Sequence, residues 1–141
     1  MSHSRKLNNK INRIHEKALR IVYSDYVSTF DELLEISSNV TIHAQNIRSL
    51  MIEMFRVKNN IAPQLLKDIF QLSPATSYFL REHKDFIIRK VNTVKYGLSS
   101  LTYIGLKLWN KLPLEVREIK SLSEFKTKIK TWKSKTCDCR L

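Results

Sequence analysis

Apolar residues recur along this chain at steps of three and four, which is the spacing of one face of an α-helix. The clearest case runs from Tyr103 to Leu112 around Trp109 and is followed by Pro113. Proline has no amide proton and restricts the residue before it, so this helix should end near Leu112. Burying a side chain as large as that of Trp109 helps to fix how neighbouring elements pack. The segment therefore predicts a corner of the hydrophobic core.

Further segments show the same helical spacing, and polar residues can cap some of them. Thr29 lies three residues before Glu32, which is the spacing of a capping box. These predicted helices cover residues 7–21, 29–35, 41–59, 63–70 and 121–132. Residues 86–96 are rich in β-branched and aromatic side chains and suit two short extended strands. The predicted fold class is therefore mainly α, a small helical domain with at most a short β-hairpin at 86–96.

The first predicted helix carries both an apolar stripe and a set of basic residues. The stripe consists of Leu7, Ile11, Ile14, Ala18 and Ile21. The basic residues are Lys6, Lys10, Arg13, Lys17 and Arg20. They suit phosphate contacts, but a solvated face would show the same pattern. If the stripe proves to be exposed, it favours docking onto another protein segment.

The length of 141 residues predicts a single domain over residues 1–141, with residues 134–141 as a flexible, truncated tail. There is no run of eighteen apolar residues, so no membrane span and no membrane partner are expected. Cys137 and Cys139 are too close in sequence to staple the fold, which favours a reducing compartment, either nuclear or cytoplasmic. Only one residue separates them, whereas paired zinc ligands usually have two to four between them. We therefore expect no bound metal and no cofactor.

Positive charge is in large excess. The chain has 25 Lys and Arg against 13 Asp and Glu, a formal net charge of +12. Residues 83–141 hold fourteen basic and five acidic groups, and positive charge also gathers near the N-terminus. This distribution indicates a polyanionic partner such as RNA or DNA. A basic surface that only keeps the protein soluble is the alternative.

The candidate nucleic-acid-binding residues lie on the first and last predicted helices. Packing of Phe125, Ile129 and Trp132 in the core would leave the lysines of the last helix on its other faces. The candidates are Lys126, Lys130, Lys133 and Lys128 on the last helix, with Arg13, Lys17 and Arg20 on the first. No base-reading motif accompanies them, so contacts to the RNA or DNA backbone should be independent of sequence.

No catalytic residue is predicted. A polymerase needs carboxylates that converge on metal ions, and no two aspartates are adjacent here. The aspartates are scattered at Asp25, Asp31, Asp68, Asp85 and Asp138. The sequence also lacks a Gly-rich phosphate loop, an HExxH pair and a GxSxG motif. The chain by itself is therefore not expected to be an enzyme.

Several short motifs follow one another in a recognisable order. They are Lys10-Ile-Asn-Arg-Ile-His15, Ile42-His43, Val57-Lys58-Asn59, Pro63, Gly105-x-Lys107-x-Trp109-Asn110-x-Leu112-Pro113 and Ser121-x-x-Glu-Phe125-Lys126. Their order and spacing resemble the C-terminal, post-thumb region of non-LTR (LINE-type, jockey-like) retrotransposon reverse transcriptases. The resemblance covers nearly the whole chain.

The resemblance implies a non-catalytic module that holds RNA or DNA near an RNA-directed DNA polymerase supplied elsewhere in the parent protein. The polymerase palm would then lie upstream of Met1, and this chain would be a fragment or a separate reading frame. The alternative is a structural or docking domain that packs against the polymerase thumb or another subunit. Its partner would then be the polymerase portion rather than nucleic acid.

Overall fold

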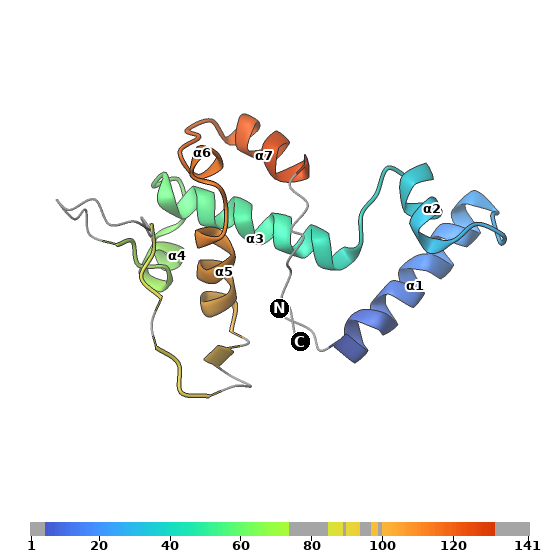
Figure 1. Ribbon diagram of the computed structural model, residues 1–141, viewed down its shortest axis with the longest axis horizontal. Coiled ribbons are helices and arrows are strands. Elements are labelled where there is room, and N and C mark those ends of the chain that lie inside the picture. The colour runs from blue at the N-terminus through green and yellow to red at the C-terminus, as the bar shows by residue number, and fades with distance from the viewer. Residues whose placement is uncertain (1–4, 74–84, 89, 94–96, 99, 132–141) are drawn as a thin grey trace. The chain divides into compact units, whose positions relative to one another are not determined.

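The computed structural model is mainly helical, as the sequence predicts (Figure 1). The structure describes residues 5–73, 85–88, 90–93, 97–98 and 100–131. The helices are α1 (Arg5–Tyr23), α2 (Phe30–Ile36), α3 (Ile42–Lys58), α4 (Gln64–Ile69), α5 (Leu101–Asn110), α6 (Leu114–Arg117) and α7 (Leu122–Thr131). Each segment for which the apolar spacing predicts a helix forms one.

The described residues divide into two compact units, the first ending at Ile47 and the second beginning at Arg48. The first unit holds α1, α2 and the start of α3. The second holds the rest of α3 together with α4, α5, α6 and α7. The expectation of a single domain stays a prediction, and the predicted tail lies outside the described residues.

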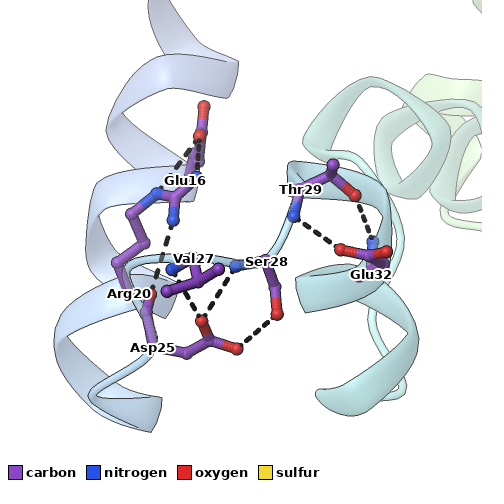
Figure 2. A network of polar contacts seen from close by, with 7 residues as sticks. All are labelled: Glu16, Arg20, Asp25, Val27, Ser28, Thr29 and Glu32. Atoms are coloured by element: carbon purple, nitrogen blue, oxygen red, sulfur yellow. Dashed lines mark hydrogen bonds and ion pairs between the residues drawn. The ribbon is translucent and has the colours of Figure 1, made fainter.

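The first unit has a small apolar core between α1 and α2. Leu19 of α1 packs with Leu33 and Leu34 of α2, and Phe30 packs against this buried cluster. The predicted capping box opens α2. The backbone N–H of residue 29 donates to the Glu32 carboxylate at 2.7 Å, and the backbone N–H of residue 32 donates to the Thr29 hydroxyl at 3.4 Å (Figure 2). This cap satisfies backbone donors that the helix itself leaves without partners.

Most of the predicted apolar stripe of α1 lies outside this core. Ile14 is 68% exposed and Ile21 is 70% exposed, and Ala18 is also exposed. Leu19 is buried because it lies on the side of α1 that packs against α2. Leu19 does not belong to the predicted stripe. The apolar surface of α1 is therefore wider than the part that α2 covers.

The second unit is built around Trp109, which is fully buried as predicted. The Phe125 ring of α7 stacks on the Phe55 ring of α3, with 4.5 Å between centroids. The same Phe125 ring lies 5.7 Å from the Trp109 ring of α5. Phe86 meets Trp109 edge-on at 5.8 Å, a favourable geometry for two aromatic rings. This aromatic cluster joins three helices that are distant in the sequence.

Of the four large apolar residues in and directly after the short helix α4, one is fully buried. Phe70, directly after the helix, is buried, and Leu66 is half-buried. Leu65 and Ile69 are exposed instead. Residues four apart share one helix face, so Leu66 and Phe70 turn inward together while Leu65 and Ile69 turn outward.

The predicted β-hairpin at 86–96 does not form in the described part of that range. Phe86 pairs instead with Leu72 in an isolated antiparallel bridge. Two backbone hydrogen bonds flank the bridge, with N···O distances of 2.8 and 3.1 Å. The Phe86 side chain is buried against Trp109. Strand propensity is a local property and does not predict such a tertiary contact.

Candidate nucleic-acid interface

Helix α7 presents lysines on a firmly anchored backbone. Its Phe125 and Ile129 side chains are buried in the second unit, which fixes the orientation of the helix. Lys126, Lys128 and Lys130 are all exposed, and none of them forms an ion pair with a described residue. Exposed lysines on a fixed helix, without ion pairs to described residues, are suited to contacting phosphate groups.

The three described lysines of α7 do not form one cluster. Lys126 and Lys130 are four residues apart and therefore share a face. Lys128 lies on the other side of the buried stripe, two residues from each of them. Lys133, the fourth candidate on this predicted helix, lies outside the described residues. The structure thus brings two of the predicted lysines together.

Arg48 of α3 adds a cation at the C-terminal end of α7. Its guanidinium donates a hydrogen bond of 2.7 Å to the backbone carbonyl of Lys130. Basic groups are favourable there because the last carbonyls of a helix lack intrahelical partners and carry partial negative charge. Arg48 is absent from the sequence candidates, since the contact joins residues 82 positions apart and has no local pattern.

The three basic candidates on α1 divide into two kinds. Arg13 and Lys17 are exposed, lie four residues apart and pair with no described acidic group. Arg20 instead donates to the Glu16 carboxylate at 2.7 and 3.2 Å, and to the Asp25 carbonyl at 3.5 Å (Figure 2). The Arg20 guanidinium therefore helps to hold the end of α1, whereas Arg13 and Lys17 remain open to a ligand.

The turn between α1 and α2 is closed by Asp25. Its Oδ1 accepts hydrogen bonds of 3.0 Å from the backbone N–H groups of Val27 and Ser28, and its Oδ2 accepts the Ser28 hydroxyl at 2.6 Å (Figure 2). The Ser28 hydroxyl, followed by the two backbone donors, lowers the pKa of the Asp25 carboxyl below its ordinary value. Asp25 is thus a structural acceptor.

A buried carboxylate organises the polar contacts of the second unit. Asp85 Oδ2 accepts the indole N–H of Trp109 at 2.8 Å and the Lys58 ammonium at 2.9 Å. Arg117 Nη1 lies 3.6 Å from the same oxygen. Lys58 also donates to the Arg117 carbonyl at 2.8 Å, and Arg117 Nε donates to the Leu112 carbonyl at 3.1 Å. The network connects α3, the segment around residue 85, α5 and α6.

Burial by itself would raise the pKa of Asp85. The hydrogen bonds from Trp109 and Lys58, together with the positive charges of Lys58 and Arg117, outweigh burial and hold the pKa below its ordinary value. The carboxylate is therefore ionised at neutral pH. With these donors directed at a single oxygen, its role in this arrangement is to satisfy the buried Arg117, the half-buried Lys58 and the indole N–H.

Sequence reasoning treats Asp85 as one of several scattered aspartates and does not anticipate this network. Lys58 and Asp85 are 27 positions apart, so no helical or strand spacing connects them. Within the described residues, no three His, Cys, Asp or Glu side chains come together to form a metal site. The predicted absence of zinc at Cys137 and Cys139 concerns residues outside that part of the chain.

Comparisons with protein-family models, with curated proteins and with solved structures give no match for this chain. The retrotransposon resemblance and the function that it implies therefore remain proposals. Among the described residues, no helix is both long enough and apolar enough to cross a membrane.

Proposed function

We propose that this protein is a non-catalytic module that binds the backbone of RNA or DNA, chiefly through the lysines of α7. The observation that carries the proposal is a set of exposed lysines without ion pairs to described residues, on a helix fixed by buried Phe125 and Ile129. The formal net charge of +12 supports a polyanionic partner. Arg13 and Lys17 of α1 supply a second basic surface, on the other unit.

The binding would be independent of base sequence. Lysine is a point charge on a flexible stem, which suits a phosphate contact better than the reading of a base edge. Aromatic residues provide stacking platforms in many single-strand-binding proteins. Trp109, Phe55 and Phe125 are fully buried and are not available for that purpose.

We further propose that the module belongs to the C-terminal region of a non-LTR retrotransposon reverse transcriptase, acting inside the cell, in the nucleus or cytoplasm. The support for this origin is the motif order that ends in Trp109-Asn110-x-Leu112-Pro113. The module would bind nucleic acid while a polymerase portion of the parent protein performs the chemistry. Reproducible primer extension by the purified chain with a primer–template and Mg²⁺ would contradict the non-catalytic assignment.

The salt dependence of RNA and DNA binding tests the α7 proposal. Each phosphate contact releases counterions, so about three contacts give a log–log slope near −2 to −3. The Lys126→Gln/Lys130→Gln/Lys133→Gln variant should flatten the slope by a similar amount and weaken all nucleic-acid sequences alike. The measurement is fluorescence anisotropy over a salt series, with circular dichroism to confirm that the variant is folded.

A charge-matched control separates a local contact from a general effect of net charge. Lys107, Lys111 and Lys120 are also exposed, and replacing them with Gln removes the same formal charge. This control should change the slope much less than the α7 variant. Equal slopes for the α7 variant and the wild type would contradict phosphate binding by these lysines and would support the alternative that they only keep the protein soluble.

Docking to another protein segment is a second candidate function, and one observation favours it. Ile14 and Ile21 of α1 are largely exposed although they belong to a regular apolar stripe. A nucleic-acid backbone offers no apolar surface to cover such a stripe. The two functions are compatible, because the basic face of α7 and the apolar face of α1 are different surfaces.

A further inference from the structure

The exposed apolar face of α1 is a continuous strip along the helix. It consists of Ile14, Ala18, Ile21 and Val22, whose spacing of four, seven and eight residues places them on one side. Val22 is 72% exposed, similar to Ile14 and Ile21. The strip extends over about 12 Å of helix, at a rise of about 1.5 Å per residue. We call these four residues the α1 strip.

The first unit leaves this strip uncovered because α2 is too small to reach it. The buried core of the unit consists of Leu19, Leu33 and Leu34. Helix α2 has seven residues and packs on the side of α1 that carries Leu19. A helix pair with such a small core gains little from its own packing, so covering further apolar surface would stabilise it.

A row of cations runs along α1 on one side of the strip and continues beyond it toward the N-terminus. Lys6, Lys10, Arg13 and Lys17 follow one another at steps of four, three and four residues, and all four are exposed. None of them forms an ion pair with a described residue. The row borders the strip on one side only, since the other side of α1 is occupied by α2. The complementary surface therefore has apolar side chains with acidic groups along one edge.

This pattern favours a protein helix over the two other anionic partners that cations can attract. Nucleic acid uses phosphates and base stacking, and the strip contains no aromatic residue. A uniformly anionic bilayer has no edge of its own, whereas the cations of α1 lie on one side of the strip only. A discrete helix can carry its acidic groups on one edge alone, and helix-in-groove recognition uses anchors at this spacing.

We propose that the α1 strip binds an amphipathic α-helix of another protein segment, with aliphatic anchors on the strip and Asp or Glu side chains against the Lys6–Lys17 row. This inference deepens the docking function proposed above. The strip supplies the apolar contact, and the row of cations sets which edge of the partner helix lies on which side. A second copy of α1 offers no acidic row to face these cations, since the one acidic residue of α1, Glu16, pairs with Arg20.

Two synthetic helical peptides test the proposal. Both have leucines at heptad positions a and d, and they differ in carrying glutamates or lysines along one edge. Fluorescence anisotropy with the full chain should show binding of the glutamate peptide and much weaker binding of the lysine peptide. The Lys10→Glu/Lys17→Glu variant should reverse this preference, because like charges then oppose the glutamate peptide.

The apolar anchors are tested with Ile14→Ala/Ile21→Ala, which should weaken binding of the glutamate peptide about tenfold or more. Alanine favours helix, and both positions are exposed, so the fold should be retained. The matched control is Ile61→Ala/Leu65→Ala, at two residues of the second unit that are 60% and 71% exposed. The control should bind the glutamate peptide as the wild type does.

Equal binding of the two peptides, or no reversal in the Lys10→Glu/Lys17→Glu variant, would overturn the proposal. A second outcome would also overturn it: the glutamate peptide does not bind, and the Ile14→Ala/Ile21→Ala variant loses binding to phosphatidylserine vesicles or to RNA. The strip would then belong to that other partner. The α7 lysine variant should bind the peptide normally. Failure of the nucleic-acid proposal is therefore distinguishable from failure of this one.

Discussion

Trp109 and Asp85 join the apolar and polar parts of the second unit through a single hydrogen bond of 2.8 Å. A buried indole N–H requires an acceptor, and a buried carboxylate requires donors, so each group satisfies the other. Lys58 and Arg117 supply the positive charge that keeps Asp85 ionised. Removing either Trp109 or Asp85 should therefore affect both the packing and the polar network.

Replacing Trp109 with alanine should lower the free energy of unfolding by about 3–5 kcal/mol, the usual range for deleting an aromatic side chain from a core. The ring is fully buried and contacts Phe86 and Phe125. Urea denaturation followed by circular dichroism measures the effect. Tyr26→Ala removes an aromatic ring that is 72% exposed, and it should change stability by no more than about 0.5 kcal/mol. An unchanged free energy of unfolding in Trp109→Ala would contradict the burial of this side chain in the core.

Replacing Asp85 with asparagine should destabilise the protein by about 1–3 kcal/mol at pH 7, because Lys58 and Arg117 lose a charged partner. Folding lowers the pKa of Asp85 from 3.8, so the ionised carboxylate contributes its full stabilisation at pH values well above 3.8. The contribution disappears as the pH falls through the lower pKa of the folded state. The stability gap between wild type and Asp85→Asn should therefore narrow between pH 5 and pH 2. Urea titrations that give the same difference in unfolding free energy at every pH in this range would contradict a role for Asp85 ionisation in stability.

At the scale of elements, local sequence fixes where helices begin, while packing decides which of their faces are buried. The Thr29–Glu32 capping box forms as its spacing predicts, because all of its atoms lie within four consecutive residues. Helix α1 shows the opposite case. Its strongest apolar stripe faces outward and Leu19 faces α2, because the position of the partner helix selects the buried side.

Loss of this cap should weaken α2 selectively. Thr29→Ala removes the hydroxyl that accepts from the Glu32 backbone N–H, and such a change typically costs about 1 kcal/mol. Hydrogen exchange at the Leu33 and Leu34 amides should become faster. Glu35→Gln alters an exposed side chain on the same helix that is not part of the cap, and it should leave those rates unchanged. Identical exchange in Thr29→Ala and wild type would mean that the cap is not formed in solution.

At the scale of the whole molecule, the two compact units differ in how much apolar surface they bury. The first has a core of three leucines. The second surrounds Trp109 with aromatic rings from α3, α7 and the segment around residue 86. Since burial of apolar surface is the main source of stability, the second unit should be the more resistant to opening.

Hydrogen exchange should reveal this difference between the units. Amides in the interior of α3 beyond Arg48, and in α5, should be protected more strongly than those of α1 and α2. Binding of the acidic helical peptide proposed above should raise protection in α1 and leave α5 unchanged, because the peptide would cover the first unit only. Equal protection of α1 and α5 in the free protein would indicate that the units unfold together.

The sequence by itself determined the class of the fold and much of the second unit. Periodic apolar residues located the helices, and the size of Trp109 marked the core, because both depend on local spacing and side-chain volume. The same spacing placed Lys126 and Lys130 on one face of α7, away from the buried Phe125 and Ile129. These inferences need only a helix and a knowledge of which residues avoid water.

Only the tertiary structure decided which contacts form between distant segments. In the described part of residues 86–96, Phe86 forms a bridge with Leu72 and not the possible hairpin, and the bond from Lys58 to Asp85 joins residues without any common spacing. Side-chain pairing across a fold depends on where whole elements lie, which a periodic pattern does not encode. For the same reason, the sequence revealed that α1 has an apolar stripe, whereas the structure decided that Ile14 and Ile21 of that stripe are exposed.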